Sequence, residues 1–164
     1  MTRLKLVTLV IFAVGISALM TTDLAAQEGA ALVKQRQTEM GQMGKAFRAV
    51  KPILKGENTN VMDAMPSAVT WHTNALKIVA NFPPDTGRDA VPDSRAKPEV
   101  WSKRSEFEAA AKKLAAEAEK LIVVTKTNEI NGFRAQFKVF AQACGGCHKG
   151  PKKEGGKFRF PKQE

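Results

Sequence analysis

The chain has 164 residues, a net charge of +10 and two cysteines, and 43% of its residues are hydrophobic. This length suits one domain of ordinary size, and two cysteines are too few for a small secreted fold built on disulfides. The basic balance favours acidic proteins or anionic surfaces as partners, while the lack of a Lys/Arg-rich recognition motif argues against nucleic acid.

The N-terminal segment has the pattern of an export signal. Arg3 and Lys5 precede an almost wholly apolar run that ends near Met20, and small residues follow. This predicts a secretory signal peptide over residues 1–26 and a periplasmic protein. An uncleaved membrane anchor is the alternative, but the apolar run is short against the roughly 20 residues that a spanning helix needs.

Hydrophobic residues recur at steps of three and four through most of the remaining chain, which predicts four amphipathic helices. The expected ranges are residues 28–55, 60–80, 98–127 and a last helix that runs from a cap at Asn128 to His148. A Pro-, Gly- and Asp-rich loop separates the second and third helices. The expected fold class is therefore all-α, an antiparallel four-helix bundle over residues 27–149.

The last predicted helix carries the sequence Cys144-Gly145-Gly146-Cys147-His148. Two thiols three residues apart with a histidine after the second are what covalent haem attachment requires. Each sulfur bonds one vinyl group, and the imidazole ligates the iron from one side. Because the cysteines continue the apolar stripe of this helix, we expect the haem to lie inside the bundle.

Three other readings of these residues remain open. An exported thiol-disulfide oxidoreductase also uses two cysteines three residues apart, although the flanks lack the strands of such a fold. Zinc could be bound by Cys144, Cys147, His148 and His72, but adjacent ligands suit tetrahedral zinc poorly. The third reading is a plain disulfide, which helix geometry disfavours.

The motif on the fourth helix of a bundle resembles class II cytochromes c, and further stretches resemble the cytochrome c′ family. These stretches are Arg36-Gln37 followed by Met40, Val50-Lys51-Pro52-Ile53 and Ala96-Lys97-Pro98-Glu99-Val100-Trp101. The resemblance covers roughly residues 30–149. It implies one covalent haem c, with Arg36 and Gln37 near the haem propionates and the residue at position 40 facing the distal side. It also implies a homodimer that pairs through the first two helices.

The family offers two iron environments, and Met40 decides between them. A bond from its sulfur makes the iron six-coordinate and suited to electron transfer. A Met40 that only packs leaves a five-coordinate iron, open to a small gas such as NO or CO. Helical spacing does not separate these cases, and core packing is the usual role of a helical methionine. Axial ligation by His72 is a further alternative.

The chain lacks a catalytic constellation, so we expect no enzyme. The predicted function is a periplasmic electron carrier with Cys144 and Cys147 holding haem, His148 as proximal ligand and acidic redox proteins as partners. Residues 150–164 are predicted to be a basic tail, either mobile or loosely docked through Phe158 and Phe160. The resemblance also implies a basic residue beyond His148, at Lys152, although Gly150 and Pro151 should end the helix first.

Overall fold

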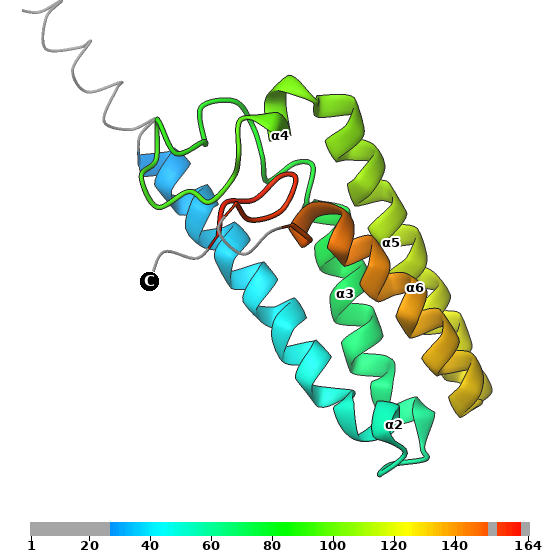
Figure 1. The fold of residues 1–164 in the computed structure, drawn as a ribbon. Helices are drawn as coiled ribbons and strands as arrows, with labels where there is room; N and C mark the ends of the chain where they lie inside the picture. The colour runs from blue at the N-terminus through cyan, green and yellow to red at the C-terminus, as the bar shows by residue number, and fades with distance from the viewer. Residues whose placement is uncertain (1–26, 151–153, 162–164) are drawn as a thin grey trace, which may run out of the picture.

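A computed structural model describes residues 27–150 and 154–161 of this chain, and it shows an antiparallel bundle of four long helices (Figure 1). The first helix covers residues 27–49 in the described part. It is followed by α3 (Met65–Lys77), α5 (Arg104–Thr127) and α6 (Ile130–His148). The predicted fold class is confirmed. Within the described residues there is no strand, only an isolated bridge between Ala96 and Arg159. The predicted signal peptide lies outside the described residues.

A short turn of helix joins the first two long helices. The first helix ends before Val50, and the chain continues as α2 (Lys51–Lys55), which has Pro52 in its first turn. Proline suits this position because the first helical amides need no partner. Gly56 then ends α2 with a positive φ of 84°, a conformation that favours glycine. The short helix η1 (Val61–Ala64) leads directly into α3.

The repeat of three and four residues in the second predicted helix puts Ala68, His72 and Ala75 on its buried face, and of these three the structure departs from the prediction only at His72. Trp71 is fully buried, whereas His72 is only half-buried. The indole of Trp71 also donates a hydrogen bond of 3.0 Å to the carbonyl oxygen of Met43 in the first helix. A large aromatic ring gains more by burial than an imidazole does, which accounts for this choice of face.

The third predicted helix is interrupted near its start. A short helix α4 (Glu99–Ser102) ends at Lys103, whose φ of −118° and ψ of 45° are not helical, and α5 begins at the next residue. The long connection that precedes α4 runs along one end of the bundle (Figure 1). The loop predicted from Pro, Gly and Asp therefore occurs where expected.

The predicted helix cap at the turn between α5 and α6 was wrong. Asn128 does not cap α6; it ends α5 in a left-handed conformation with φ 56°. Its side-chain oxygen accepts a hydrogen bond of 2.7 Å from the backbone nitrogen of Val61, so it ties this turn to η1. Glu129 is the residue that precedes α6, and it makes no side-chain capping bond. The side chain of Asn128 thus bonds a residue that is distant in the sequence instead of capping α6.

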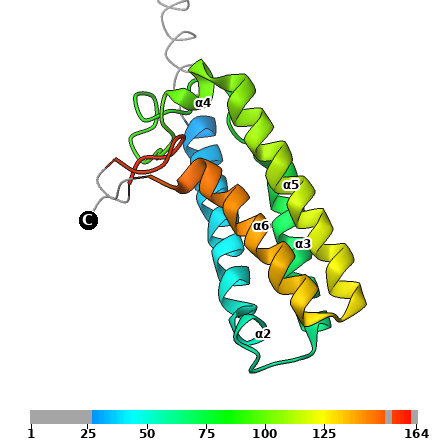
Figure 2. The same ribbon diagram turned by 45° about the vertical axis from the view of Figure 1, so that its right-hand side comes forward.

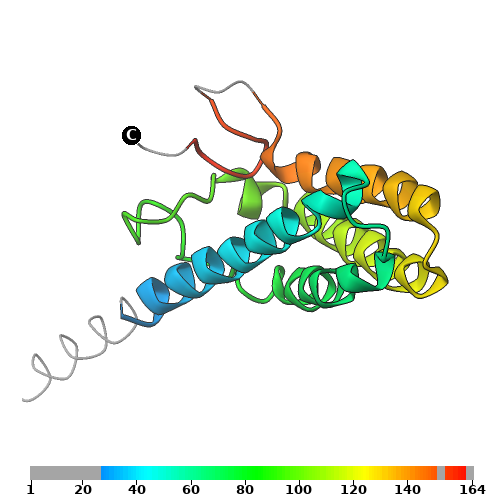
Figure 3. The same ribbon diagram turned by 90° about the horizontal axis from the view of Figure 1, so that it is seen from below.

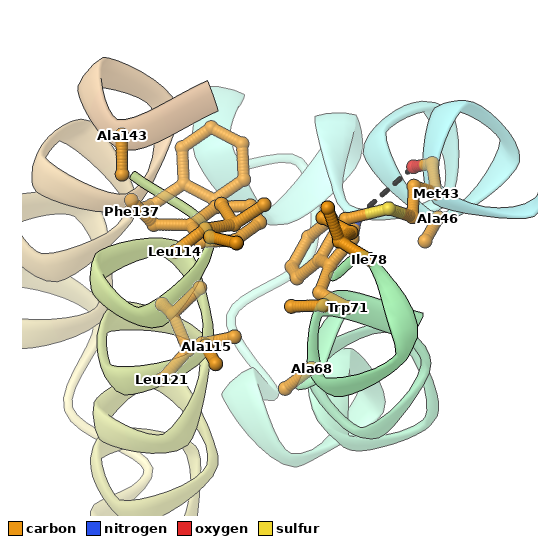
Figure 4. Close-up of a cluster of buried hydrophobic side chains, with 14 of the residues drawn as sticks. Met43, Ala46, Ala68, Trp71, Ile78, Leu114, Ala115, Leu121, Phe137 and Ala143 are labelled. Carbon is orange, nitrogen blue, oxygen red and sulfur yellow. Dashed lines mark hydrogen bonds between the residues drawn. The ribbon is translucent and has the colours of Figure 1, made fainter. Parts of the chain in front are cut away.

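One half of the bundle is densely packed, and we call it the packed half. Its large side chains are almost fully buried and come from the α2–η1 segment, α3, α5 and α6, and Figure 4 shows two of them, Trp71 and Leu121. They are Val50, Ile53, Val61, Trp71, Leu121, Phe133 and Phe140. The rings of Trp71 and Phe140 lie 4.8 Å apart. Burial of several aromatic side chains here supplies much of the hydrophobic stabilisation of the fold.

Residues 154–161 fold back onto the bundle, and we call them the C-terminal strap. Figures 2 and 3 show this segment beside the end of α6 and the loop before α4. The side chain of Phe158 is 4% exposed and packs edge-on against Phe107, with ring centroids 5.4 Å apart. Of the two states expected for the tail, the structure shows the docked one for these residues. None of the described helices is both long and apolar enough to cross a bilayer.

Candidate functional site

A cavity of about 510 Å³ lies between the first helix and the end of α6. Its volume is in the range of small-molecule and cofactor pockets. Cys144, Cys147 and His148 line it from α6, and Met40 lines it from the first helix. The strap adds Phe158, and other apolar side chains complete the wall. The sequence motif and the predicted distal residue therefore meet at one cavity.

The first helix turns a distinct face toward this cavity. The repeat of three and four residues that predicts this helix runs along one face, which we call the predicted stripe, and four of its members line the cavity: Gln37, Met40, Gly44 and Phe47. Val33, from the same repeat, is the most buried of the hydrophobic side chains in this helix and also lines the cavity. The predicted stripe is therefore the face that this helix turns toward the cavity. Two glycines open this wall further, because a Cβ added at Gly41 would meet no atom within 4 Å.

The electrostatic setting of the two thiols disfavours thiolate chemistry. Burial raises the pKa of Cys144 to about 11, with a smaller contribution from Cys147, and burial also raises the pKa of Cys147. Reactive dithiols need a lowered pKa, because the thiolate is the nucleophile. Both thiols are protonated at neutral pH, and they form no disulfide with each other. The thiol-disulfide oxidoreductase reading is therefore not supported.

His148 is held as a neutral imidazole. Its pKa falls to about 4, because its surroundings are desolvated and because the charges of Arg159 and Arg95 disfavour the imidazolium. A nitrogen of Arg159 lies 2.7 Å from Nδ1 of His148. Only a neutral imidazole can give a lone pair to a metal ion. The site thus keeps His148 uncharged, which iron ligation requires.

Arg36 lies in the cavity wall, but its guanidinium already has protein partners. It donates to the carbonyl oxygen of Thr86 at 2.8 Å and to the hydroxyl oxygens of Thr86 and Ser94 at 3.1 and 3.3 Å. It also lies over the ring of Phe82, 4.2 Å from the centroid. Burial lowers its pKa to about 10, so it stays charged at neutral pH. Arg36 therefore organises the loop before α4 as well as lining the cavity. Its neighbour Gln37 donates 3.1 Å to the carbonyl oxygen of Asp93 in the same loop.

Arg95 and Arg159 are cavity residues that sequence reasoning missed. Nε of Arg95 is buried and has no hydrogen-bond partner. Among the described residues that line the cavity, three are arginines and none is acidic. An apolar cavity with unbalanced positive charge fits a flat apolar ligand that carries carboxylates, which is the chemistry of haem. The Phe158-Arg159-Phe160 run of alternating aromatic and basic residues was the only sequence signal for this wall.

The zinc alternative and the role of His72 fail on geometry. Within residues 27–150 and 154–161, no three His, Cys, Asp or Glu side chains come together as a metal site. His72 lies on α3 and is not among the residues that line the cavity. Axial ligation by His72 was therefore a wrong alternative. Lys152, the basic residue implied beyond His148, lies outside the described residues.

Comparison with known proteins agrees with this site. The family model described as Cytochrome C′ matches residues 31–150. A curated relative, cytochrome c-556 from Agrobacterium tumefaciens strain II Chrys, is 32% identical over 119 residues, which cover 71% of this chain and 92% of the relative. Cytochrome c′ from Rubrivivax gelatinosus is 40% identical over 62 residues, 38% of this chain and 48% of the relative.

Solved structures show the same fold. The crystal structure of cytochrome c′ from Rubrivivax gelatinosus has a TM-score of 0.68 and 27% identity, and the match covers 80% of this chain and 96% of that one. A ferrous variant of cytochrome c′ from Alcaligenes xylosoxidans with bound NO has a TM-score of 0.67 and 22% identity, over 80% and 94% of the two chains. Proteins of this family bind a covalent c-type haem with its iron.

Proposed function

This chain belongs to the cytochrome c′ family, and we propose from that premise that it is an exported electron carrier. One observation supports the proposal above the others: both cysteines and the histidine of the attachment motif line one cavity of cofactor size. Bound haem would supply an iron centre that gains and loses one electron. Cys144 and Cys147 would hold the porphyrin, and His148 would ligate the iron. We assign the chain no catalytic role.

The arginines of the cavity suit the haem carboxylates. Arg36 and Arg95 line it, and Nε of Arg95 lacks a partner among the protein atoms. A buried donor without an acceptor costs about 1–3 kcal/mol, so an acceptor on the ligand would remove this cost. We therefore extend the propionate partners expected at Arg36 and Gln37 to Arg95.

Haem staining tests the proposal directly. The chain is expressed with its export signal in a host competent for cytochrome maturation, then separated on a denaturing gel. We expect covalent haem in the wild type and none in the double variant Cys144→Ala/Cys147→Ala, because no thioether bond can form. His148→Ala should keep the covalent haem and change its absorption spectrum. A mature wild-type mass that equals the bare polypeptide would overturn the proposal.

Met40 is our choice for the second iron ligand. It lines the cavity from the first helix, across from the helix that carries His148. A thioether opposite an imidazole gives low-spin iron and a raised reduction potential, which suit electron transfer. We expect Met40→Ala to convert a low-spin ferrous spectrum into a high-spin one. A wild-type spectrum that is already high-spin, and unchanged by the substitution, would contradict this assignment.

Gas binding is the second candidate function. The open space beside Gly41, and at Gly44 a nearest atom 3.9 Å away on flexible Arg48, leave room next to Met40 for a small ligand. Structural relatives include cytochromes c′ with bound NO or CO. Titration of the ferrous protein with CO separates the candidates. Saturation of the wild type at micromolar CO supports the gas-binding function, while binding only after Met40→Ala supports the electron carrier.

We propose acidic redox partners and a periplasmic location for this protein. The net charge of +10 favours acidic redox proteins through long-range attraction. The predicted signal peptide places the protein in the periplasm, which cell fractionation with haem staining would test. Enrichment of the haem band in the cytoplasm would contradict that location.

A homodimer is the remaining proposal on assembly. Met62, Val69 and Leu76 are exposed apolar residues spaced seven apart on η1 and α3. One structural relative is a cytochrome c′ with ligand-controlled dimer dissociation. Pairing through the first two helices would cover this stripe. Light scattering at micromolar concentration should report a dimer for the wild type and a monomer for Leu76→Glu. A wild-type monomer would refute the pairing.

A further inference from the structure

The last turn of α6 is intrinsically weak although it carries the haem-binding groups. Gly145 and Gly146 lie between the two cysteines, and each costs about 1 kcal/mol of helix stability relative to alanine. A Cβ at Gly146 would meet nothing within 4 Å, so no close packing in this structure explains that glycine. A turn of this composition needs support from outside the helix.

The C-terminal strap provides this support through its backbone. The backbone nitrogen of Phe158 donates to the carbonyl oxygen of Cys147 at 3.4 Å. A Cβ added at Gly156 would lie 2.2 Å from that same oxygen and 2.6 Å from the backbone of His148. Only glycine lets the strap approach the turn this closely. Gly156 therefore marks a backbone-to-backbone contact on the haem-binding turn.

The strap is in turn fixed to the rest of the bundle. Phe158 accepts a backbone hydrogen bond of 3.1 Å from Lys97, and Phe160 donates one of 2.9 Å to Arg95. The ring of Phe158 is buried against Phe107 of α5. The strap therefore joins the end of α6 to the loop before α4 and to α5.

We propose that the C-terminal strap clamps the last turn of α6 and so positions His148 as the ligand of the haem iron. The inference rests on the proposed function. The clamp acts through Gly156 and Phe158 rather than through Arg159. Arginine only donates, so Nδ1 of His148 accepts in the present contact. An imidazole bound to iron through Nε2 carries its proton on Nδ1 and cannot accept there.

Hydrogen exchange of the full chain tests the clamp with and without haem. Gly156→Ala forces a Cβ into backbone atoms, and Phe158→Ala removes the buried anchor. We expect amides of residues 144–149 to exchange about tenfold faster or more in both variants, because local opening no longer requires undocking of the strap. Gly132→Ala is the matched control: it lies on the same helix, and its Cβ would meet Val124 at an ordinary 3.6 Å. Unchanged exchange in both strap variants would overturn the clamp.

Electron paramagnetic resonance of ferrous holoproteins with excess nitric oxide tests the consequence for His148, and every protein compared, the one with the wild-type strap included, carries Met40→Ala so that the gas reaches the iron. Nitrogen hyperfine structure reports whether an imidazole remains opposite the bound gas. We expect the strap variants to lose this imidazole signal at least several times faster than the protein with the wild-type strap and the Gly132→Ala control. Equal rates would overturn the positioning role. Failure of the proposed function is distinguishable, because it appears as absent covalent haem, while the exchange measurement still applies to the protein without haem.

Discussion

The packed half and the cavity half of this bundle differ in what occupies the space between the helices. In the packed half, side chains from the α2–η1 segment, α3, α5 and α6 fill the interior, and Trp71, Phe133 and Phe140 have no accessible surface. In the cavity half, the helices leave a cavity of about 510 Å³. Two glycines of the first helix border it, and so do three arginines, one each from the first helix, the loop before α4 and the strap. The packed half buries a large apolar area between its side chains. The cavity half buries less apolar area and leaves space for a ligand instead.

This difference shows how the bundle can hold a large cofactor. The packed half fixes the relative positions of the helices through contacts between their own buried side chains. The cavity half is closed by segments from outside the helices, namely the loop before α4 and the C-terminal strap. Stability and function are therefore separated along the bundle axis, and substitutions should act differently in the two halves.

The largest effect is expected for Trp71→Ala in the packed half. The substitution removes a fully buried ring and its hydrogen bond to Met43. We expect a loss of about 3–5 kcal/mol in the free energy of unfolding, because the remaining cavity cannot collapse between the helices. Urea unfolding followed by circular dichroism measures it. Val123→Ala, at an exposed position of α5, should change stability by less than about 0.5 kcal/mol.

A leucine pair compares the halves directly. Leu121 is fully buried in the packed half, whereas Leu114 lines the cavity. Without haem, Leu121→Ala should cost about 2–4 kcal/mol and Leu114→Ala clearly less, because Leu114 lacks neighbours on its cavity side. With haem bound, the two costs should approach each other. Equal losses in the protein without haem would show that the cavity half is packed in solution.

Arg36→Met probes the loop that closes the cavity half. It removes hydrogen bonds from a charged donor to Thr86 and Ser94. We expect a loss of about 2 kcal/mol, together with faster hydrogen exchange in the loop before α4. Lys34→Met, which removes an exposed cation from the same helix, is the control and should be nearly neutral. An unchanged loop would mean that Arg36 serves the ligand alone.

The smallest effect on stability is expected for Glu117, which joins α5 to α6, and this effect depends on pH. Hydrogen bonds from Gln136 and Lys120 lower the pKa of Glu117. A lowered pKa in the folded state means stability that is present at neutral pH and lost as pH falls below the ordinary glutamate value of 4.5. We expect Glu117→Gln to lower Tm by about 2 °C at pH 7. Thermal scans should show this difference disappearing toward pH 3, and a constant difference would contradict it.

Local sequence patterns were enough for most of the fold. The step of three and four residues predicted the long helices, and Pro, Gly and Asp predicted the loop before α4. The errors arose where distant partners intervened. Asn128 was expected to cap α6, but its side chain bonds the backbone of Val61, which is 67 residues away in the sequence. On α3, contact with Met43 selected Trp71 for burial in place of the neighbouring His72.

The sequence predicted the attachment motif and the predicted stripe of the first helix. Both depend on residues of a single helix, where the spacing along the chain fixes which side chains share a face. The rest of the cavity wall could not be predicted in this way. Arg95 and Arg159 are far apart in the chain and meet only because the strap pairs with residues 95–97. Such a contact depends on the path of the backbone through space, which no local periodicity encodes. The sequence by itself thus determined the bundle and the chemistry of α6, and the tertiary structure decided which segments enclose that chemistry.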